Sequence, residues 1–223
     1  MKTANKKEIL PIGLIILCFL VGILMYPNLP DKMPVHWNIK GEIDGWASKN
    51  FAVFFFPIII LAIYVLMLLM PLIDPLKENY QKFKETYFWF RAILVVLFSL
   101  LYFYTLLASR GLELDIKLFI VPAFSIFFIF IGLFLPKIKK NYFVGIKTPW
   151  TFHSEEVWDK THKFGGKLFI MAGILSFLGL PFSQYSFWIF ICSVLGATIG
   201  ATVYSYIVFT KLPTPPRGTV NKE

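Results

Sequence analysis

Long apolar segments alternate with short polar segments along the whole chain of 223 residues. Four apolar segments approach or reach the roughly 17–25 residues that a helix needs to cross a bilayer. They cover 9–26, 51–73, 92–109 and 118–135. A longer stretch, 168–210, spans about twice the hydrocarbon thickness as a helix, and LPFSQYS at 180–186 supplies proline and polar residues for a turn. The pattern predicts an all-α, polytopic integral membrane protein with six transmembrane helices.

Composition supports a membrane protein, and the basic residues predict its orientation. The chain is 57% hydrophobic with a mean hydropathy of +0.67, whereas a soluble domain of this size needs more polar surface. With the N-terminus inside, most of the 22 Lys and Arg residues lie in cytoplasmic segments. Both termini are therefore expected on the cytoplasmic side of the cell membrane. The same bias explains the net charge of +9 without direct binding of nucleic acid.

The order of the segments predicts four parts. Residues 1–75 are expected to form a helix pair with an extracellular loop, and 76–117 a connecting membrane helix. Residues 118–211 are expected to form a core of three membrane helices with a polar cytoplasmic loop, followed by a cytoplasmic tail at 212–223.

The first polar segment, residues 26–50, is expected to form a small ordered cap outside the cell. Pro27, Pro30 and Pro34 prevent a helix across its first half. VHWNI has a short β-like pattern, and KGEIDGW has glycine at two turn positions. Such a cap is either a receptor surface or a structural lid over the helices.

The second polar segment, residues 141–169, is expected in the cytoplasm. Ser154 can cap a helix that carries acidic residues in its first turn. Apolar residues and a row of lysines fall on different faces of that helix. We therefore expect a short amphipathic helix that lies on the inner leaflet. It is expected to precede the fifth span and to connect to it through residues 165–166.

Trp158 and His162 are four residues apart and share one side of this helix. In one interpretation Trp158 anchors the helix in the lipid interface and His162 donates a hydrogen bond. In the other, both contact a binding partner. The segment GATIG at 196–200 is expected to pack on neighbouring helices of the same chain, with a dimer contact as the alternative.

The sequence gives little support to catalysis or ion transport. The six predicted spans contain no Asp, Glu, Lys, Arg or His, and Arg91 lies at the edge of the third, which argues against an ion-coupled transporter. His153 and His162 do not have the spacing of a helical metal pair. No nucleophile elbow, P-loop or dinucleotide motif is present. We expect no enzyme, no metal and no cofactor. A transporter or envelope-maintenance protein is the alternative function.

Two segments resemble a known family. LPDKMPVHWNIKGEIDGWASK, at 29–49, resembles an N-terminal domain of unknown function found in bacterial membrane proteins. NYFVGIKTPWTFHSEEVWDKTHKFGGKLF, at 141–169, is similar to the core motif of the SdpI family. Members of that family are immunity proteins against the sporulation-delaying peptide toxin, and the resemblance covers nearly the whole chain.

This resemblance implies partners and site residues. The partners are membrane lipids, a secreted peptide toxin and a small DNA-binding autorepressor that the protein holds at the membrane. Toxin sensing is expected in the outer loop, at His36, Trp37, Asn38, Gly41 and Asp44. Regulator docking is expected at the cytoplasmic motif, at Asn141, Gly145, Lys147, Thr148, Pro149, Trp150, Glu156, Trp158, Lys160, His162, Lys163, Gly166 and Lys167.

Overall fold

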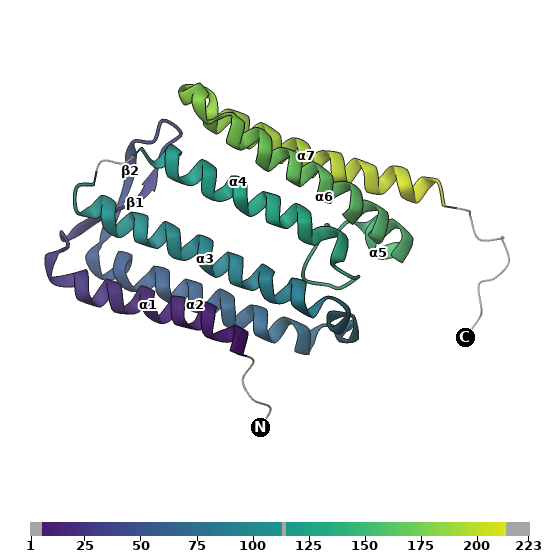
Figure 1. The fold of residues 1–223 in the computed structure, drawn as a ribbon, viewed down its shortest axis with the longest axis horizontal. Helices are drawn as coiled ribbons and strands as arrows, with labels where there is room; N and C mark the ends of the chain where they lie inside the picture. Colours follow the sequence, from purple (N-terminus) through teal and green to yellow (C-terminus); the bar gives the residue numbers. More distant parts are fainter. Residues whose placement is uncertain (1–5, 113–114, 213–223) are drawn as a thin grey trace.

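The protein forms an elongated bundle of helices with a β-hairpin at one end, as the computed structural model shows for residues 6–112 and 115–212 (Figure 1). The N-terminal half contains η1 (Lys6–Glu8), α1 (Ile9–Met25), η2 (Tyr26–Asn28), β1 (Lys32–Trp37), β2 (Ile43–Ser48), α2 (Lys49–Ile73), η3 (Lys77–Phe83) and α3 (Lys84–Ser109). The C-terminal half contains α4 (Ile116–Phe134), η4 (Leu135–Lys137), α5 (Pro149–His153), α6 (Glu155–Leu178), η5 (Leu180–Tyr185) and α7 (Ser186–Thr210). The predicted tail lies outside the described residues except for its first residue, Leu212.

Five helices of the described residues are long and apolar enough to cross a membrane. They are Lys6–Asn28, Lys49–Ile73, Lys77–Ser109, Ile116–Lys137 and Ser186–Thr210. The predicted fifth span is the second half of α6. This helix is not among the five, because its first half is rich in charged residues. The all-helical, polytopic class is confirmed, and the number of six crossings remains a prediction.

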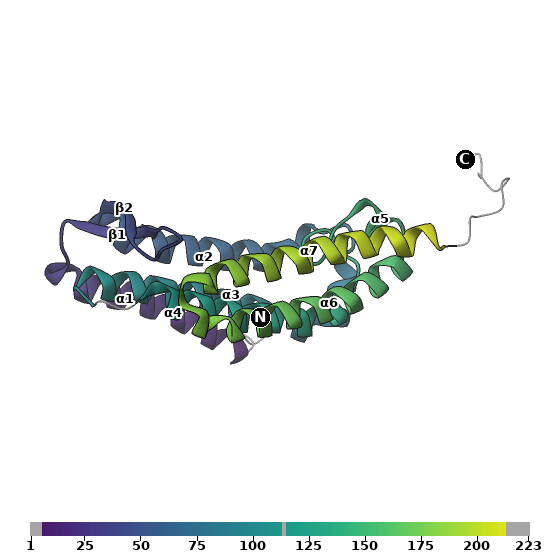
Figure 2. The ribbon, with the colours of Figure 1, turned by 90° about the horizontal axis from the view of Figure 1, so that it is seen from above.

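The helices pack as two neighbouring groups. In one, α1, α2 and α3 enclose a core that includes Cys18, Val53 and Tyr102. In the other, α6 packs against both α4 and α7 (Figures 1 and 2). The two groups meet where α3 contacts α4.

Helices α4 and α6 approach each other closely because glycines face each other across the contact. A Cβ atom on Gly132 would lie 2.5 Å from the carbonyl oxygen of Gly166, and a Cβ on Gly166 would lie 2.6 Å from that of Gly132. Two turns away, a Cβ on Gly173 would lie 2.6 Å from the carbonyl oxygen of Ser125. The two helices therefore run antiparallel with their backbones in contact.

Two sequence predictions about α6 are wrong. A separate helix before the fifth span does not form, because 155–178 is one continuous helix, and the face of its first turns that carries Val157 and Trp158 is buried against protein. The side chain of Trp158 is 0% exposed and therefore cannot anchor a helix in the lipid interface. The apolar face of α6 that carries Val157 and Trp158 thus packs against protein instead of lipid. The predicted helix start is correct, since the Ser154 side chain accepts a hydrogen bond from the Glu156 N–H.

The small residues of α7 divide between a packed and an open side. Ala197 and Ala201 are buried, and a Cβ on Gly200 would contact Leu168 of α6. A Cβ on Gly196 would meet nothing within 4 Å. Packing on the same chain thus uses the alanines and Gly200, and Gly196 takes no part in it.

Candidate functional site: an outer hairpin and a buried motif loop

The β-hairpin confirms the β-like pattern of the first polar segment. Strands β1 and β2 pair antiparallel, with register shifts on both sides of His36. His36 lies opposite Gly45, where a Cβ would come within 2.7 Å of the His36 Cβ. Glycine at this position therefore lets the two strands close around the irregularity, and such bulges turn a side chain in a new direction.

His36 and Asp44 form an exposed pair on this hairpin. The distance from His36 Nδ1 to Asp44 Oδ1 is 2.6 Å, and both side chains are open to solvent. Exposed pairs of this kind add little to stability, at most about 1 kcal/mol. The pair therefore presents polar groups at the surface without holding the fold together.

Asn38 and Gly41 shape the turn between the strands. The Asn38 Oδ1 accepts hydrogen bonds from the backbone N–H groups of Lys40, at 2.9 Å, and Glu42, at 3.1 Å. Gly41 has φ +86°, a left-handed conformation that favours glycine. Both predicted residues thus have a conformational role in the turn.

The hairpin rests on both helical groups. The Trp37 ring lies edge-on to Tyr104 of α3, with centroids 5.4 Å apart. At the turn, a Cβ on Gly41 would lie 3.3–3.4 Å from Asp115 and Ile116 at the start of α4. Trp46 is 57% exposed. Trp37 is therefore a structural contact, and Trp46 is the tryptophan of this hairpin that reaches outward.

At the opposite end of the bundle, residues 138–148 form the motif loop, and Asn141 is its centre. The Asn141 Oδ1 accepts from the N–H groups of Phe143, at 2.9 Å, and Val144, at 2.7 Å. Its Nδ2 donates to the carbonyls of Lys139, at 2.8 Å, and Val144, at 2.9 Å. Asn141 is fully buried, so an amide that both donates and accepts is needed here.

Asp74, which is not among the predicted site residues, ties this loop to the N-terminal half. Its carboxylate accepts from the Tyr142 N–H at 2.9 Å, the Leu76 N–H at 2.7 Å and the Tyr80 hydroxyl at 3.0 Å. Asp74 is 2% exposed. A carboxylate buried directly after an apolar helix needs several donors, and its position before Pro75 was the available signal.

His162 joins the motif loop to α6. Its Nε2 accepts from the Ile146 N–H at 3.0 Å, so the hydrogen resides on Nδ1, which donates to the Trp158 carbonyl at 2.8 Å. The rings of His162 and Trp158 stack with centroids 4.1 Å apart, and Trp158 Nε1–H donates to the Ile138 carbonyl. Burial lowers the pKa of His162 to about 4. The predicted hydrogen bond and the shared face are confirmed.

Thr148, Pro149 and Trp150 fasten the end of the loop to α7. Thr148 caps α5 in a reciprocal capping box with Thr151, and Pro149 occupies the first turn. The Thr148 hydroxyl lies 3.0 Å from that of Ser205. The Trp150 ring lies 5.1 Å from that of Tyr206.

The remaining motif residues lie at the surface or at helix contacts. Lys147 Nζ donates to the carbonyls of Tyr142 and Phe143. Glu156 and Lys160 form an exposed i,i+4 pair at 2.6 Å. Lys163 and Lys167 are exposed, whereas Gly145 and Gly166 fit against other backbone or rings. Asn141, Thr148, Trp158 and His162 are buried, so the exposed residues are the part of the motif that a partner can reach.

The part of the chain that the structure describes contains no candidate metal site. No group of three or more His, Cys, Asp or Glu side chains lies close enough there to hold an ion.

Five membrane-length helices around these two polar segments define a multi-pass α-helical membrane protein. Residues 137–205 match the SdpI/YfhL protein family, and residues 13–61 match a domain of unknown function, DUF1648. The chain is 30% identical over 208 residues to the immunity protein SdpI of Bacillus subtilis (strain 168), which covers 93% of this chain and 98% of that protein. The chain therefore belongs to the SdpI family, as its two motifs predict. No solved structure gives a significant match.

Proposed function

We propose that this protein is a membrane immunity protein that protects the cell from a secreted peptide toxin, without turnover of a substrate. The observation that carries the proposal is the similarity to an immunity protein along 98% of that protein's length. The matched region includes both the hairpin and the motif loop, so the whole architecture supports the proposal, not a single motif.

We further propose six crossings with both termini in the cytoplasm. The glycine contacts of α6 with α4 favour a sixth crossing, because the second half of α6 runs antiparallel beside a membrane-length helix. The Glu8–Arg91 pair brings the start of α1 beside the start of α3, and the Asp74–Tyr142 bond brings the motif loop to the end of α2. The lysine-rich segments thus share one end, which the positive-inside rule assigns to the cytoplasm.

In this orientation the hairpin lies outside the cell, where a secreted toxin arrives. His36 and Asp44 present exposed polar groups there, and Trp46 presents an exposed ring. An exposed polar pair and an exposed aromatic side chain on the same hairpin suit the recognition of a peptide. We propose that toxin contact takes place on this surface.

Survival and membrane potential of a toxin-sensitive strain test the proposal. The strain would lack its own immunity gene and express this protein while the sporulation-delaying peptide is titrated. The wild type should protect, and His36→Ala or Asp44→Asn should lose protection. His153→Ala is the matched control, because His153 is an exposed histidine at the opposite end. Failure of the wild type to protect, with the protein present in the membrane, would contradict an immunity role against this toxin.

Retention of a small DNA-binding autorepressor at the membrane is a second candidate function. Lys160, Lys163 and Lys167 are exposed along one side of α6, where an acidic surface can dock. Replacing all three with Gln should abolish toxin-dependent induction and leave survival intact. Lys77→Gln with Lys82→Gln changes exposed lysines of the same end and serves as the control.

A further inference from the structure

A polar cavity of about 300 Å³ opens where α1 begins, α2 ends and α3 begins. Its lining includes Arg91, Lys84, Gln81, Glu8, Glu85 and Tyr87. The motif loop is not part of this cavity, and the family motifs do not account for it. Cationic and hydrogen-bonding side chains at the end of an apolar bundle require a polar occupant, either water or a ligand.

Arg91 is the most buried cation of this cavity, at 7% exposed. One nitrogen, Nη2, donates to Glu8 Oε1 at 2.7 Å, and the other Glu8 oxygen accepts from the Tyr64 hydroxyl. The guanidinium lies over the rings of Tyr64 and Tyr87. Its Nε has no hydrogen-bond partner among the described residues. Glu8 therefore uses only part of the hydrogen-bonding capacity of Arg91, which has five N–H donors.

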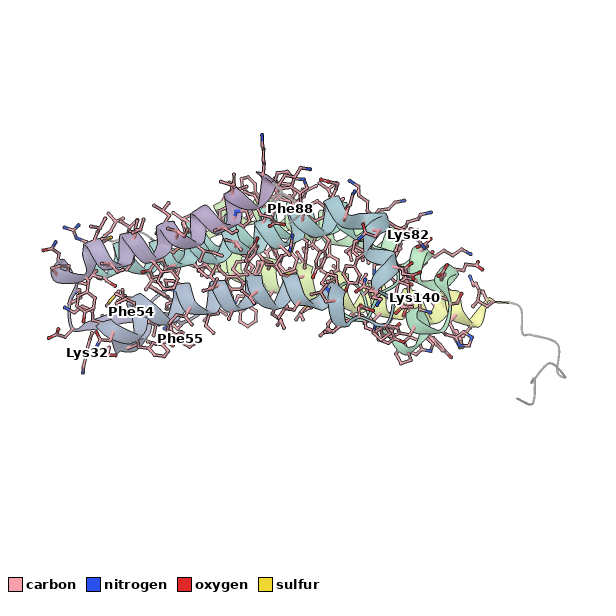
Figure 3. The ribbon with its side chains drawn as sticks, turned by 90° about the horizontal axis from the view of Figure 1, so that it is seen from below. Lys32, Phe54, Phe55, Lys82, Phe88 and Lys140 are labelled. Atoms are coloured by element: carbon pink, nitrogen blue, oxygen red, sulfur yellow. The ribbon has the colours of Figure 1, made fainter. Side chains whose placement is uncertain are left out.

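An apolar groove of about 440 Å³ adjoins the cavity. Ile9, Leu10 and Trp89 line the groove, and Phe88 lines both the groove and the cavity. Phe88 is buried and lies beside the start of α1 (Figure 3). A polar site for a head group and an apolar site for a chain thus lie side by side, at the end of membrane-length helices.

Charge selects the kind of head group. Lys6, Lys7, Lys84 and Arg91 surround the two sites, against Glu8 and Glu85. Lys7 pairs with Glu85, and Arg91 pairs with Glu8. Lys84 forms no ion pair among the described residues, so a cation of this site is left to interact with the head group. An anionic phosphate is therefore favoured over a purely cationic head group.

We propose that the cavity and the groove together bind one glycerophospholipid. Its phosphate lies between Arg91 and Lys84, and an acyl chain follows Leu10 and Trp89. The bound lipid links the start of α1 to α3 and so supports the Glu8–Arg91 contact. With the orientation proposed above, this lipid belongs to the inner leaflet, but the binding site itself does not depend on that orientation.

Lipid retention and lipid-dependent stability of the full-length protein test this proposal. Purified protein in detergent is analysed for bound phosphorus and by native mass spectrometry. After delipidation, phosphatidylglycerol and phosphatidylethanolamine are titrated while thermal unfolding is followed. We expect one retained phospholipid per chain, and a rise in unfolding temperature with either lipid.

Two variants and two matched controls locate the site. Lys84→Glu reverses the charge at the cavity, and Leu10→Trp fills the groove; each should weaken lipid binding about tenfold. Lys82→Glu changes a nearby lysine that does not line this cavity. Leu20→Trp changes a leucine of α1 that is 52% exposed, compared with 53% for Leu10. Both controls should bind lipid like the wild type.

Three results would overturn the proposal. The first is equal lipid binding by the variants and their controls. The second is equal stabilisation by diacylglycerol, which has the chains without the phosphate. The third is that inorganic phosphate alone reproduces the stabilisation, which would make the cavity a site for free phosphate. Toxin protection is not used as the readout, so a failure of the immunity proposal would not affect this test.

Discussion

Gly145 lies so close to His162 that a Cβ atom at position 145 would clash with the Nε2 atom of the histidine. Gly145 has φ +123°, a conformation that side chains rarely permit. The next residue, Ile146, donates its N–H to the same Nε2 atom at 3.0 Å. Glycine and histidine therefore depend on each other: the glycine allows the loop to approach, and the histidine accepts the hydrogen bond that holds it.

Gly145→Ala should destabilise the protein by roughly 2–3 kcal/mol. The left-handed backbone costs an alanine about 1–2 kcal/mol, and displacement of His162 loses a hydrogen bond worth about 1 kcal/mol. Thermal unfolding of the purified protein in detergent measures the change. Gly111→Ala is the control, because Gly111 has φ +82° but a Cβ there would meet nothing within 4 Å. If both variants lose the same stability, the contact with His162 contributes nothing.

Protonation of His162 should make the protein less stable in acid. Burial lowers its folded pKa from about 6.5 to about 4, so the unfolded chain binds the proton first as the pH falls. Stability is therefore lost between pH 6.5 and 4, by up to about 3 kcal/mol, and this contribution is constant below pH 4. Unfolding followed across this range should show a smaller loss for His162→Gln, which stays neutral.

His153→Gln is the control for this pH dependence. His153 is exposed, with its ring edge-on to Phe209, and its replacement should leave the loss of stability in acid as it is in the wild type. An unchanged pH dependence in His162→Gln would mean that folding does not lower the pKa of His162.

Hydrophobicity predicted the helices well, because it depends on local composition. The first two predicted spans, 9–26 and 51–73, differ from α1 and α2 by at most two residues at either end. The turn predicted at 180–186 corresponds to η5 and the first residue of α7. The start of α6 after Ser154 was also predictable, because a cap depends on a few adjacent residues.

What covers a helix face could not be predicted from composition. The stripe that includes Val157 and Trp158 is apolar whether it faces lipid or protein, and it faces protein. Two adjacent glycines, as at 165–166, are compatible both with a flexible link and with a close helix contact. The Asp74–Tyr142 bond joins residues 68 positions apart, and no local pattern indicates such a pair.

Asn141→Asp should destabilise the motif loop by about 3 kcal/mol or more. The substitution places a carboxylate oxygen where Nδ2 now donates to the carbonyls of Lys139 and Val144. Oxygen then faces oxygen in a fully buried site, and the charge lacks a partner. Asn79→Asp loses one bond to a carbonyl in a half-buried site near Lys82 and should cost much less. Equal unfolding temperatures for the two variants would contradict the central role of Asn141.

The contact between α4 and α6 supports the sixth crossing and can be tested at Gly132. A Cβ in Gly132→Ala would lie 2.5 Å from the Gly166 carbonyl and 2.8 Å from the Ile170 nitrogen, both backbone atoms that cannot rotate away. The helices must separate, at a cost of about 1–3 kcal/mol. Gly196→Ala, in open space, should cost nothing measurable. The separation should also displace η4 and with it the motif loop, so Gly132→Ala should weaken toxin protection as well as stability. If Gly132→Ala behaves like Gly196→Ala in thermal unfolding, α4 and α6 do not meet through their glycines, and the argument for α6 as a membrane crossing loses its support.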